Sequence, residues 1–144
     1  QKVPYINPKN SKENKSEKGA YVVNITSHDN NVTLVASGTE VELALKVQER
    51  LKENNIHSKV VSMPCMELFD KQSVDYQREI LEESSLIVTF EAWSIMSLQK
   101  YINFKGINLG IDKFGESAPY KEVYNYLDLS EDKITSFIQK KLRE

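Results

Sequence analysis

The fold is decided by one stretch of the sequence, which covers residues 32–51 and reads VTLVASGTEVELALKVQERL. Residues 32–36 form a largely apolar run, and such runs are typical of strands that are covered on both faces, as in parallel sheets between helices. Apolar residues then recur at helical spacing from Val41 to Leu51, with charged residues on the opposite face. Because residues 58–63 are again rich in apolar side chains, the sequence predicts a strand–helix–strand unit.

Further strands continue this pattern in both directions. Residues 86–90 and 107–111 predict buried strands, and residues 74–81 predict a short helix. Residues 21–25 predict a first strand, and the short turn before residues 32–36 predicts that these two strands pair antiparallel. The predicted fold class is α/β, a three-layer α/β/α sandwich with helices on both faces of a mostly parallel five-stranded sheet with one antiparallel strand.

Local signals predict where the helices begin. Thr39 and Glu42 have the spacing of a capping box, in which the hydroxyl and the carboxylate bond the free backbone N–H groups of the first turn. A helical stripe covers residues 95–102, residues 117–119 begin another helix, and a final helix follows Ser130. The side chains that the final helix is predicted to turn inward are Ile134, Phe137, Ile138 and Leu142.

Length and composition limit the function. The 144 residues suffice for one domain, predicted to be residues 20–144, and residues 1–19 are predicted to be a tail or a linker from an upstream domain. With 19 basic and 21 acidic residues the net charge is -2, so no single-sign field recruits nucleic acid or an anionic membrane. No apolar stretch is long enough to span a bilayer or to form a signal peptide, and a cytoplasmic location is expected.

Candidate functional residues follow the strands, because ligands of open parallel sheets bind beyond the carboxyl ends of the strands. The candidates for a regulatory ligand or an interface are Gly38, Thr39, Glu91, Trp93, Gly115, Glu116 and Ser117. Gly38 and Thr39 precede a helix whose free N–H groups suit an anion, although two glutamates follow and make helix capping the simpler interpretation. Glu91 is either a general acid or base, or a hydrogen-bond acceptor at the edge of the sheet.

Cys65 is the only cysteine, so an internal disulfide and a cysteine-based metal cluster are excluded. A nucleophilic thiol needs a nearby base or positive charge, and the sequence places neither His28 nor His57 beside it. The alternative is a partly buried, unreactive thiol. No catalytic residue, cofactor-binding residue or metal ligand is assigned to this chain.

Several segments resemble the C-terminal domain of the transketolase family. They are VASGTEV (35–41), VVSMPC (60–65) with its continuation ELFDKQ (67–72), FEA (90–92) and FGESAP (114–119). Together they have the order and spacing of that family across residues 20–144. Trp93 departs from the resemblance, because many members have a small residue there and an indole would fill a small-molecule pocket at that strand end.

The resemblance implies a role within a larger enzyme. Transketolases are homodimers that move a two-carbon ketol unit between sugar phosphates, with thiamine diphosphate and a divalent cation such as Mg²⁺ or Ca²⁺ bound between two other domains. One of those domains carries a Gly-Asp-Gly motif, which this sequence lacks. The resemblance therefore implies that the cofactor belongs to the upstream domains, and that this domain is structural or regulatory and inactive alone.

Two alternatives stay open. A free-standing regulatory module would bind a sugar phosphate or nucleotide at the strand ends near Gly38, Glu91 and Gly115. The chain would otherwise be the matching domain of another thiamine enzyme, such as dihydroxyacetone synthase or a deoxyxylulose phosphate synthase. The segments at residues 62–64 and 114–119 favour transketolase over these enzymes.

Overall fold

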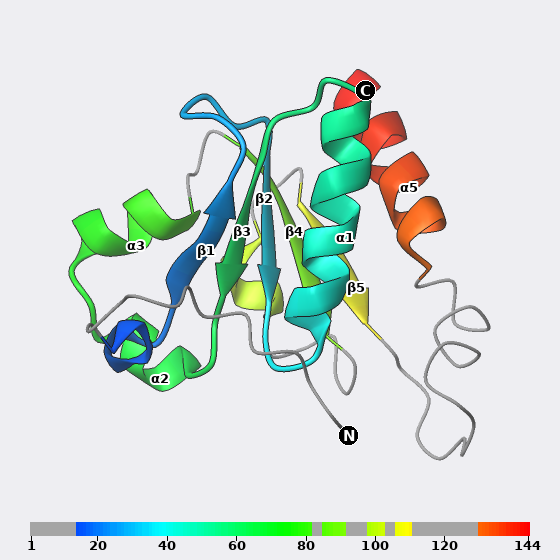
Figure 1. The fold of residues 1–144 in the computed structure, drawn as a ribbon. Coiled ribbons are helices and arrows are strands. Elements are labelled where there is room, and N and C mark those ends of the chain that lie inside the picture. Colours follow the sequence, from blue (N-terminus) through cyan, green and yellow to red (C-terminus); the bar gives the residue numbers. More distant parts are fainter. Residues whose placement is uncertain (1–13, 82–84, 92–97, 103–105, 111–129) are drawn as a thin grey trace, which may run out of the picture.

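The computed structural model describes residues 14–81, 85–91, 98–102, 106–110 and 130–144 (Figure 1). Its elements are η1 (Lys15–Lys18), β1 (Tyr21–Ile25), β2 (Val32–Ala36), α1 (Glu40–Glu53), β3 (Ser58–Ser62), α2 (Met66–Asp70), α3 (Val74–Leu81), β4 (Leu86–Glu91), η2 (Gln99–Tyr101), β5 (Ile107–Gly110) and α5 (Glu131–Arg143). The predicted strands and the helix at residues 74–81 are confirmed. The predicted helix start at residues 117–119 and the first part of the 95–102 stripe lie outside the described residues.

The strands form one sheet in the order β1-β3-β2-β4-β5. β2 lies parallel to β3 and to β4, and β5 lies parallel to β4. Of the strands that the structure describes, only β1 is antiparallel, and its partner is β3. The mostly parallel sheet with one antiparallel strand is therefore confirmed, whereas the prediction that the first two strands pair with each other is wrong.

The pairing of β1 has a physical reason. Both edges of β2 are occupied by β3 and β4, and all five of its residues are buried. The segment between β1 and β2 is tied to the start of β3, since the Thr26 N–H donates to the Ser58 carbonyl at 3.0 Å and the Asn31 N–H donates to the His57 carbonyl at 2.9 Å. The short connection therefore crosses β3, and β1, which is only half covered, takes the outer position.

Helices cover both faces of the sheet. α1 and α5 pack on one face, in a core that includes Leu34, Val47 and Ile138, and α1 and α5 lie side by side there (Figure 1). α2, α3 and η2 pack on the other face, in a core that includes Val35 and Phe69. Leu34 and Val35 are neighbours in β2 and enter different cores, as the two-residue repeat of a strand requires. The three-layer sandwich is confirmed.

The start of α1 differs from the predicted capping box. Thr39 has helical dihedral angles, with φ -68° and ψ -24°, and its side chain caps no backbone N–H. The Thr39 hydroxyl instead donates to Glu40 Oε1 at 2.8 Å, and the Glu42 carboxylate pairs with Lys46 at 2.9 Å. A capping box needs an extended residue at the cap, so the helical backbone of Thr39 rules it out. The acidic first turn still suits the helix dipole.

α5 confirms only half of its predicted inward stripe. Ile134 and Ile138 are buried in the core against α1 and the sheet. Phe137 is 51% exposed and Leu142 is 38% exposed, so the prediction that these two side chains point inward is wrong. Successive residues of a helix point about 100° apart, so Phe137 and Leu142 lie to either side of the direction that Ile134 and Ile138 share.

The chain enters the domain through a tight contact. Gly19 has φ +81°, and its carbonyl accepts from the Cys65 N–H at 3.1 Å. A Cβ atom on Gly19 would lie 2.3 Å from both the Cys65 carbonyl oxygen and the Phe69 nitrogen. Residues 14–19 therefore lie against the β3–α2 connection, and the predicted boundary at residue 19 stays a prediction.

Candidate functional site

The carboxyl ends of three parallel strands meet at one edge of the sheet. Ala36 of β2 is paired with Ser62 of β3 on one side and with Phe90 of β4 on the other. The residues that follow, among them Gly38, Thr39 and Glu91, are thereby brought to the same edge. The other predicted positions, which are Trp93, Gly115, Glu116 and Ser117, lie outside the described residues.

The loop between β2 and α1 has acidic surroundings. Gly38 has φ +57°, and a Cβ atom on it would lie 3.9 Å from Glu40 Oε2. Glu40 is only 7% exposed, and Glu42 follows in the same turn. Carboxylates this close to the first turn occupy the positive end of the helix dipole themselves. The geometry therefore opposes the anion site that free N–H groups alone would suggest.

Glu91 ends β4 as a hydrogen-bond acceptor. Its Oε2 accepts from the backbone N–H of Leu98 at 3.3 Å, which connects the end of β4 to the start of η2. The Glu91 side chain is half-buried, and Leu98 is in the core beneath α2. This contact fits the interpretation of Glu91 as a hydrogen-bond acceptor at the end of its strand.

Cys65 is a free, half-buried thiol. Its Sγ lies 3.4 Å from Glu67 Oε2 and donates to it. The pKa of the Glu67 carboxyl is lowered, first by the backbone N–H of Glu67 itself and then by the thiol. The described side-chain partner of the Cys65 thiol is thus a carboxylate, and not the positive charge that marks many reactive cysteines.

A cluster that the sequence analysis missed joins α2 to η2. The hydroxyl of Tyr101 donates to Asp70 Oδ1 at 2.7 Å, and the Lys100 ammonium donates to Asp70 Oδ2. The Tyr101 ring packs edge-on against Phe69, with 5.6 Å between the ring centroids. Asp70 stands in the ELFDKQ segment, which was the only sequence signal that pointed to this corner.

The electrostatics of this cluster suit a structural contact between α2 and η2. The hydrogen bonds from Lys100 and then from Tyr101 lower the pKa of Asp70 below its ordinary value. Burial, followed by the hydrogen bond to Asp70, raises the pKa of Tyr101 to about 12. Tyr101 thus stays protonated at neutral pH and Asp70 stays ionised, so neither group is poised near pH 7 as a general acid or base would be.

Among the residues that the structure describes, no group of three His, Cys, Asp or Glu side chains is arranged to hold a metal ion. Within the same residues, no helix is long and apolar enough to cross a bilayer.

The fold and this edge define the class of protein: a three-layer α/β domain in which the described polar side chains at the strand ends are hydrogen-bonded within the chain. A family model described as "Transketolase-like TK C-terminal domain" matches residues 19–130. The chain belongs to the transketolase C-terminal domain family.

Individual relatives agree with this assignment. A chloroplastic transketolase of Solanum tuberosum is 37% identical over 122 residues, which are 83% of this chain and 16% of that protein. The transketolase of Bacillus subtilis (strain 168) is 42% identical over 111 residues, which are 76% of this chain and 17% of that protein. The chain thus spans about a sixth of the length of these relatives.

Solved structures show the same fold. The transketolase of Campylobacter jejuni superposes with a TM-score of 0.76 at 35% identity, over 86% of this chain and 19% of that one. A transketolase from Pichia stipitis in complex with sedoheptulose 7-phosphate superposes with a TM-score of 0.80 at 27% identity, over 90% of this chain and 18% of that one.

Proposed function

We propose that this chain acts as the C-terminal assembly domain of a transketolase, an enzyme that transfers a two-carbon ketol unit between sugar phosphates. The observation that carries the proposal is the match of residues 19–130 to the C-terminal domain family. The transketolases that this chain resembles are about six times as long as the segment they share with it. The rest of such an enzyme would hold the reacting groups, and this domain would support folding and assembly. We also infer a cytoplasmic location.

The same proposal assigns the cofactor to other domains. Thiamine diphosphate and Mg²⁺ or Ca²⁺ would bind upstream in the complete homodimeric enzyme, and this chain would contribute no catalytic residue. Supporting this division, the described polar groups at the carboxyl edge are engaged within the chain, Thr39 with Glu40 and Glu91 with Leu98. Side chains held in this way stabilise loops, whereas a binding site would keep them directed at a ligand.

An interface role for the candidate positions is better supported than a regulatory ligand site. Gly38, Thr39 and Glu91, together with Trp93 and residues 115–117, would act as interface positions toward the rest of the enzyme. The buried Glu40 carboxylate beside Gly38 argues against a sugar phosphate there, because two anions would meet at one helix start.

The test exchanges domains between this chain and a complete relative. Residues 20–144 would replace the matching segment of the Bacillus subtilis transketolase, and ketol transfer would be measured with fructose 6-phosphate as donor, beside the native enzyme and a truncated enzyme without that segment. We expect transfer by the chimera, little soluble truncated enzyme, and no transfer by the isolated chain with thiamine diphosphate and Mg²⁺. Ketol transfer by the isolated chain would overturn the proposal.

A thermal-shift titration distinguishes the assembly role from a regulatory ligand site. The isolated chain would be titrated with fructose 6-phosphate and, separately, with thiamine diphosphate. We expect no saturable rise in Tm with either compound. A saturable rise with the sugar phosphate that Glu91→Gln abolishes would replace the assembly role by a regulatory ligand site at the carboxyl edge.

A further inference from the structure

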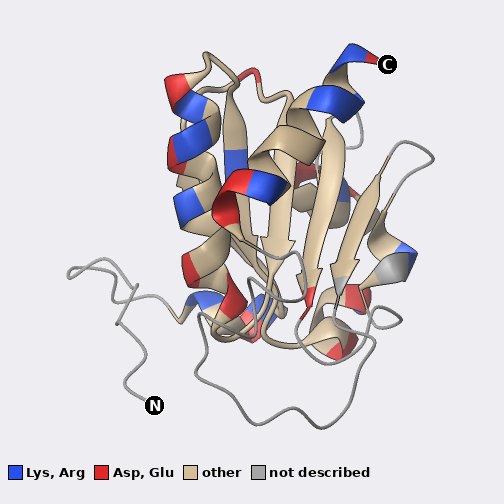
Figure 2. Ribbon diagram, turned by 90° about the vertical axis from the view of Figure 1, so that its right-hand side faces the viewer, with Lys and Arg blue, Asp and Glu red and all other residues tan. Residues whose placement is uncertain are grey.

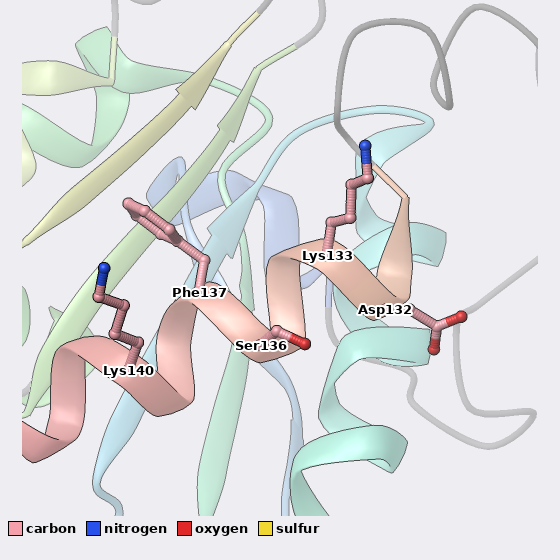
Figure 3. Close-up of a pocket in the computed structure, with 5 residues that line it drawn as sticks. All are labelled: Asp132, Lys133, Ser136, Phe137 and Lys140. Atoms are coloured by element: carbon pink, nitrogen blue, oxygen red, sulfur yellow. The ribbon is translucent and has the colours of Figure 1, made fainter.

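One side of α5 presents an exposed aromatic ring at the middle of the helix. Phe137 lies six residues after Glu131 and six before Arg143, the two ends of α5, and it is 51% exposed. An open pocket of about 380 Å³ lies beside the ring (Figure 3). The described residues that line it belong to α5 and are Asp132, Lys133, Ser136, Phe137 and Lys140. Exposed apolar groups with a polar rim are typical of docking surfaces.

Two lysines flank the ring on the same side of the helix. Lys133 precedes Phe137 by four residues, and Lys140 follows it by three. At about 100° per residue, both lie within about 60° of Phe137 around the helix, and about 6 Å and 4.5 Å from it along the axis. Figure 3 shows these three side chains projecting from one side of α5. This side of α5 is therefore an apolar centre with a positive charge before it and another after it.

The carboxylates of α5 are bound to other partners. Glu131 and Asp132, in the acidic first turn, lie 3.4 Å and 3.5 Å from Arg50 of α1 (Figure 2). Asp132 also points about 140° around the helix from the aromatic ring. At the other end of α5, the Glu144 carboxylate accepts from the Lys141 ammonium at 3.0 Å. The charges closest to the ring in direction are therefore those of the two flanking lysines.

The spacing of this stripe suits a helical partner. Residues 133, 137, 140 and 144 are separated by four, three and four positions, the repeat along which two helices pack at a shallow angle. A second copy of α5 is a poor partner. In an antiparallel pair centred on Phe137, Lys133 comes level with Lys140 of the copy to within about one residue, so like charges meet. The stripe instead complements a helix that carries carboxylates at the two matching positions.

We propose that this side of α5 binds an acidic amphipathic helix of a partner protein, which places an apolar side chain against Phe137 and a carboxylate opposite each of Lys133 and Lys140. Ile134 and Ile138 fix the inner side of α5 in the core, and an ordered helix loses little conformational entropy when it docks. Such binding is independent of the proposed enzyme function, so a chimera without ketol transfer would leave it unaffected. One helix pair buries less than the roughly 800 Å² per partner of a standard interface, so the Kd lies between about 10 μM and 1 mM.

Calorimetric titration of the full chain with two synthetic helices tests the proposal. The Glu peptide is a helix-forming sequence of about 20 residues, whose apolar stripe is centred on a Leu with a Glu about one turn before it and another about one turn after it. The Lys peptide has Lys in place of those two Glu and is otherwise identical. We expect the Glu peptide to bind with a Kd of about 10 μM to 1 mM, and the Lys peptide to bind about tenfold or more weakly. Binding of the Glu peptide should weaken with salt.

Matched variants test the individual contacts. Phe137→Ala should weaken binding of the Glu peptide about tenfold, whereas Leu142→Ala, at a side chain of the same helix that is 38% exposed, should leave it unchanged. The double variant Lys133→Glu, Lys140→Glu should exchange the preference and bind the Lys peptide about as tightly as the original chain binds the Glu peptide. Lys52→Glu, on the exposed side of α1, should not exchange it. Circular dichroism verifies that each variant is folded.

Several results would overturn the proposal. They are no binding of the Glu peptide up to about 1 mM, equal binding of the two peptides, equal losses in Phe137→Ala and Leu142→Ala, and a folded double variant that does not gain the Lys peptide. Other occupants are followed by sedimentation equilibrium of the chain alone and by titration with a single-stranded oligonucleotide. We expect no self-association and no oligonucleotide binding that depends on Phe137. If Phe137→Ala abolished either one, this side of α5 would belong to that occupant and the proposal would be wrong.

Discussion

At the scale of single residues, Gly19 and Gly38 share a positive φ and differ in their surroundings. A Cβ atom on Gly19 would meet two backbone atoms at 2.3 Å, whereas the nearest atom to a Cβ on Gly38 is a flexible carboxylate oxygen at 3.9 Å. We expect Gly19→Ala to lower the free energy of unfolding by about 2–5 kcal/mol, from backbone strain and overpacking together. Gly38→Ala should lower it by about 1–2 kcal/mol, from strain alone.

Urea unfolding followed by circular dichroism measures both losses. Because each variant adds one methyl group at a positive φ, Gly38→Ala is the matched control for Gly19→Ala. Equal losses would mean that the β3–α2 connection moves aside freely, which would contradict the tight contact at the entry of the chain.

Asp70 makes a pH-dependent contribution at the same scale. Lys100 and Tyr101 donate to its carboxylate and hold its folded pKa below the ordinary value. The contribution is complete above the unfolded pKa of about 4, and is lost as the pH falls through the lower folded pKa. The original chain should exceed Asp70→Asn in stability by less than about 1 kcal/mol at pH 7, because the Lys100 and Asp70 side chains are both exposed, and this difference should shrink as the pH falls below about 4.

Urea unfolding at several pH values between 7 and 2.5 measures that gap. Tyr101→Phe removes one of the two donors to Asp70 and should show a smaller pH dependence of the same sign. If the difference in stability between the original chain and Asp70→Asn were the same at pH 7 and pH 3, the hydrogen bonds to the ionised Asp70 carboxylate would not be its cause.

At the scale of elements, α5 shows what periodicity predicts and what it leaves undecided. The apolar residues at 134, 137, 138 and 142 fit one broad helical stripe, yet only Ile134 and Ile138 enter the core. Periodicity gives the direction of an apolar face but not the width of the surface that covers it. That width depends on α1 and the sheet, which are distant in the sequence.

The two kinds of apolar position in α5 differ in their effect on stability. We expect Ile138→Ala to lower the free energy of unfolding by about 2–4 kcal/mol, because its side chain is fully buried and leaves a cavity. Leu142→Ala, at a side chain that is 38% exposed, should cost less than about 1 kcal/mol. Chemical denaturation of both variants measures the difference, and a loss in Leu142→Ala as large as that in Ile138→Ala would restore the broad inward stripe.

For the strands, too, local patterns predict the element but not its neighbours. The type and position of each strand could be predicted, because a buried parallel strand has an apolar run of its own. The partner of β1 could not, since the length of the 26–31 turn permits a hairpin as readily as a crossing over β3. The crossing is decided by the Thr26 and Asn31 backbone bonds to the start of β3, which no local pattern encodes.

At the scale of the whole molecule, the candidate site was predictable in part. Topology alone brings Gly38 and Glu91 to one edge, because parallel strands end together. The Asp70–Lys100–Tyr101 cluster was not predictable, since 30 residues separate Asp70 from Lys100 and only the packing of η2 beneath α2 joins them. The family could be recognised from the order and spacing of several short segments, although each segment alone is a weak signal.

Three contacts connect the start of the folded unit to the rest of the domain. The Gly19 carbonyl accepts from Cys65, the Tyr76 hydroxyl donates to the Ala20 carbonyl at 2.7 Å, and the Lys18 ammonium lies 4.6 Å from the centre of the Tyr76 ring. Removal of residues 14–19 would leave the Cys65 N–H without its acceptor. A chain that starts at Ala20 should therefore be less stable than one that starts at Asn14, by about 1–3 kcal/mol.

Denaturation of the two shortened chains measures this difference, and Lys18→Met in the longer one is the control. That substitution removes only the cation above the Tyr76 ring and should cost less than about 1 kcal/mol at this exposed site. Equal stability of the two shortened chains would place the boundary at residue 19, as the composition of the tail predicts. A clear loss would place residues 14–19 within the folded domain, so that whatever precedes Asn14 is joined to the domain at a fixed point beside α2.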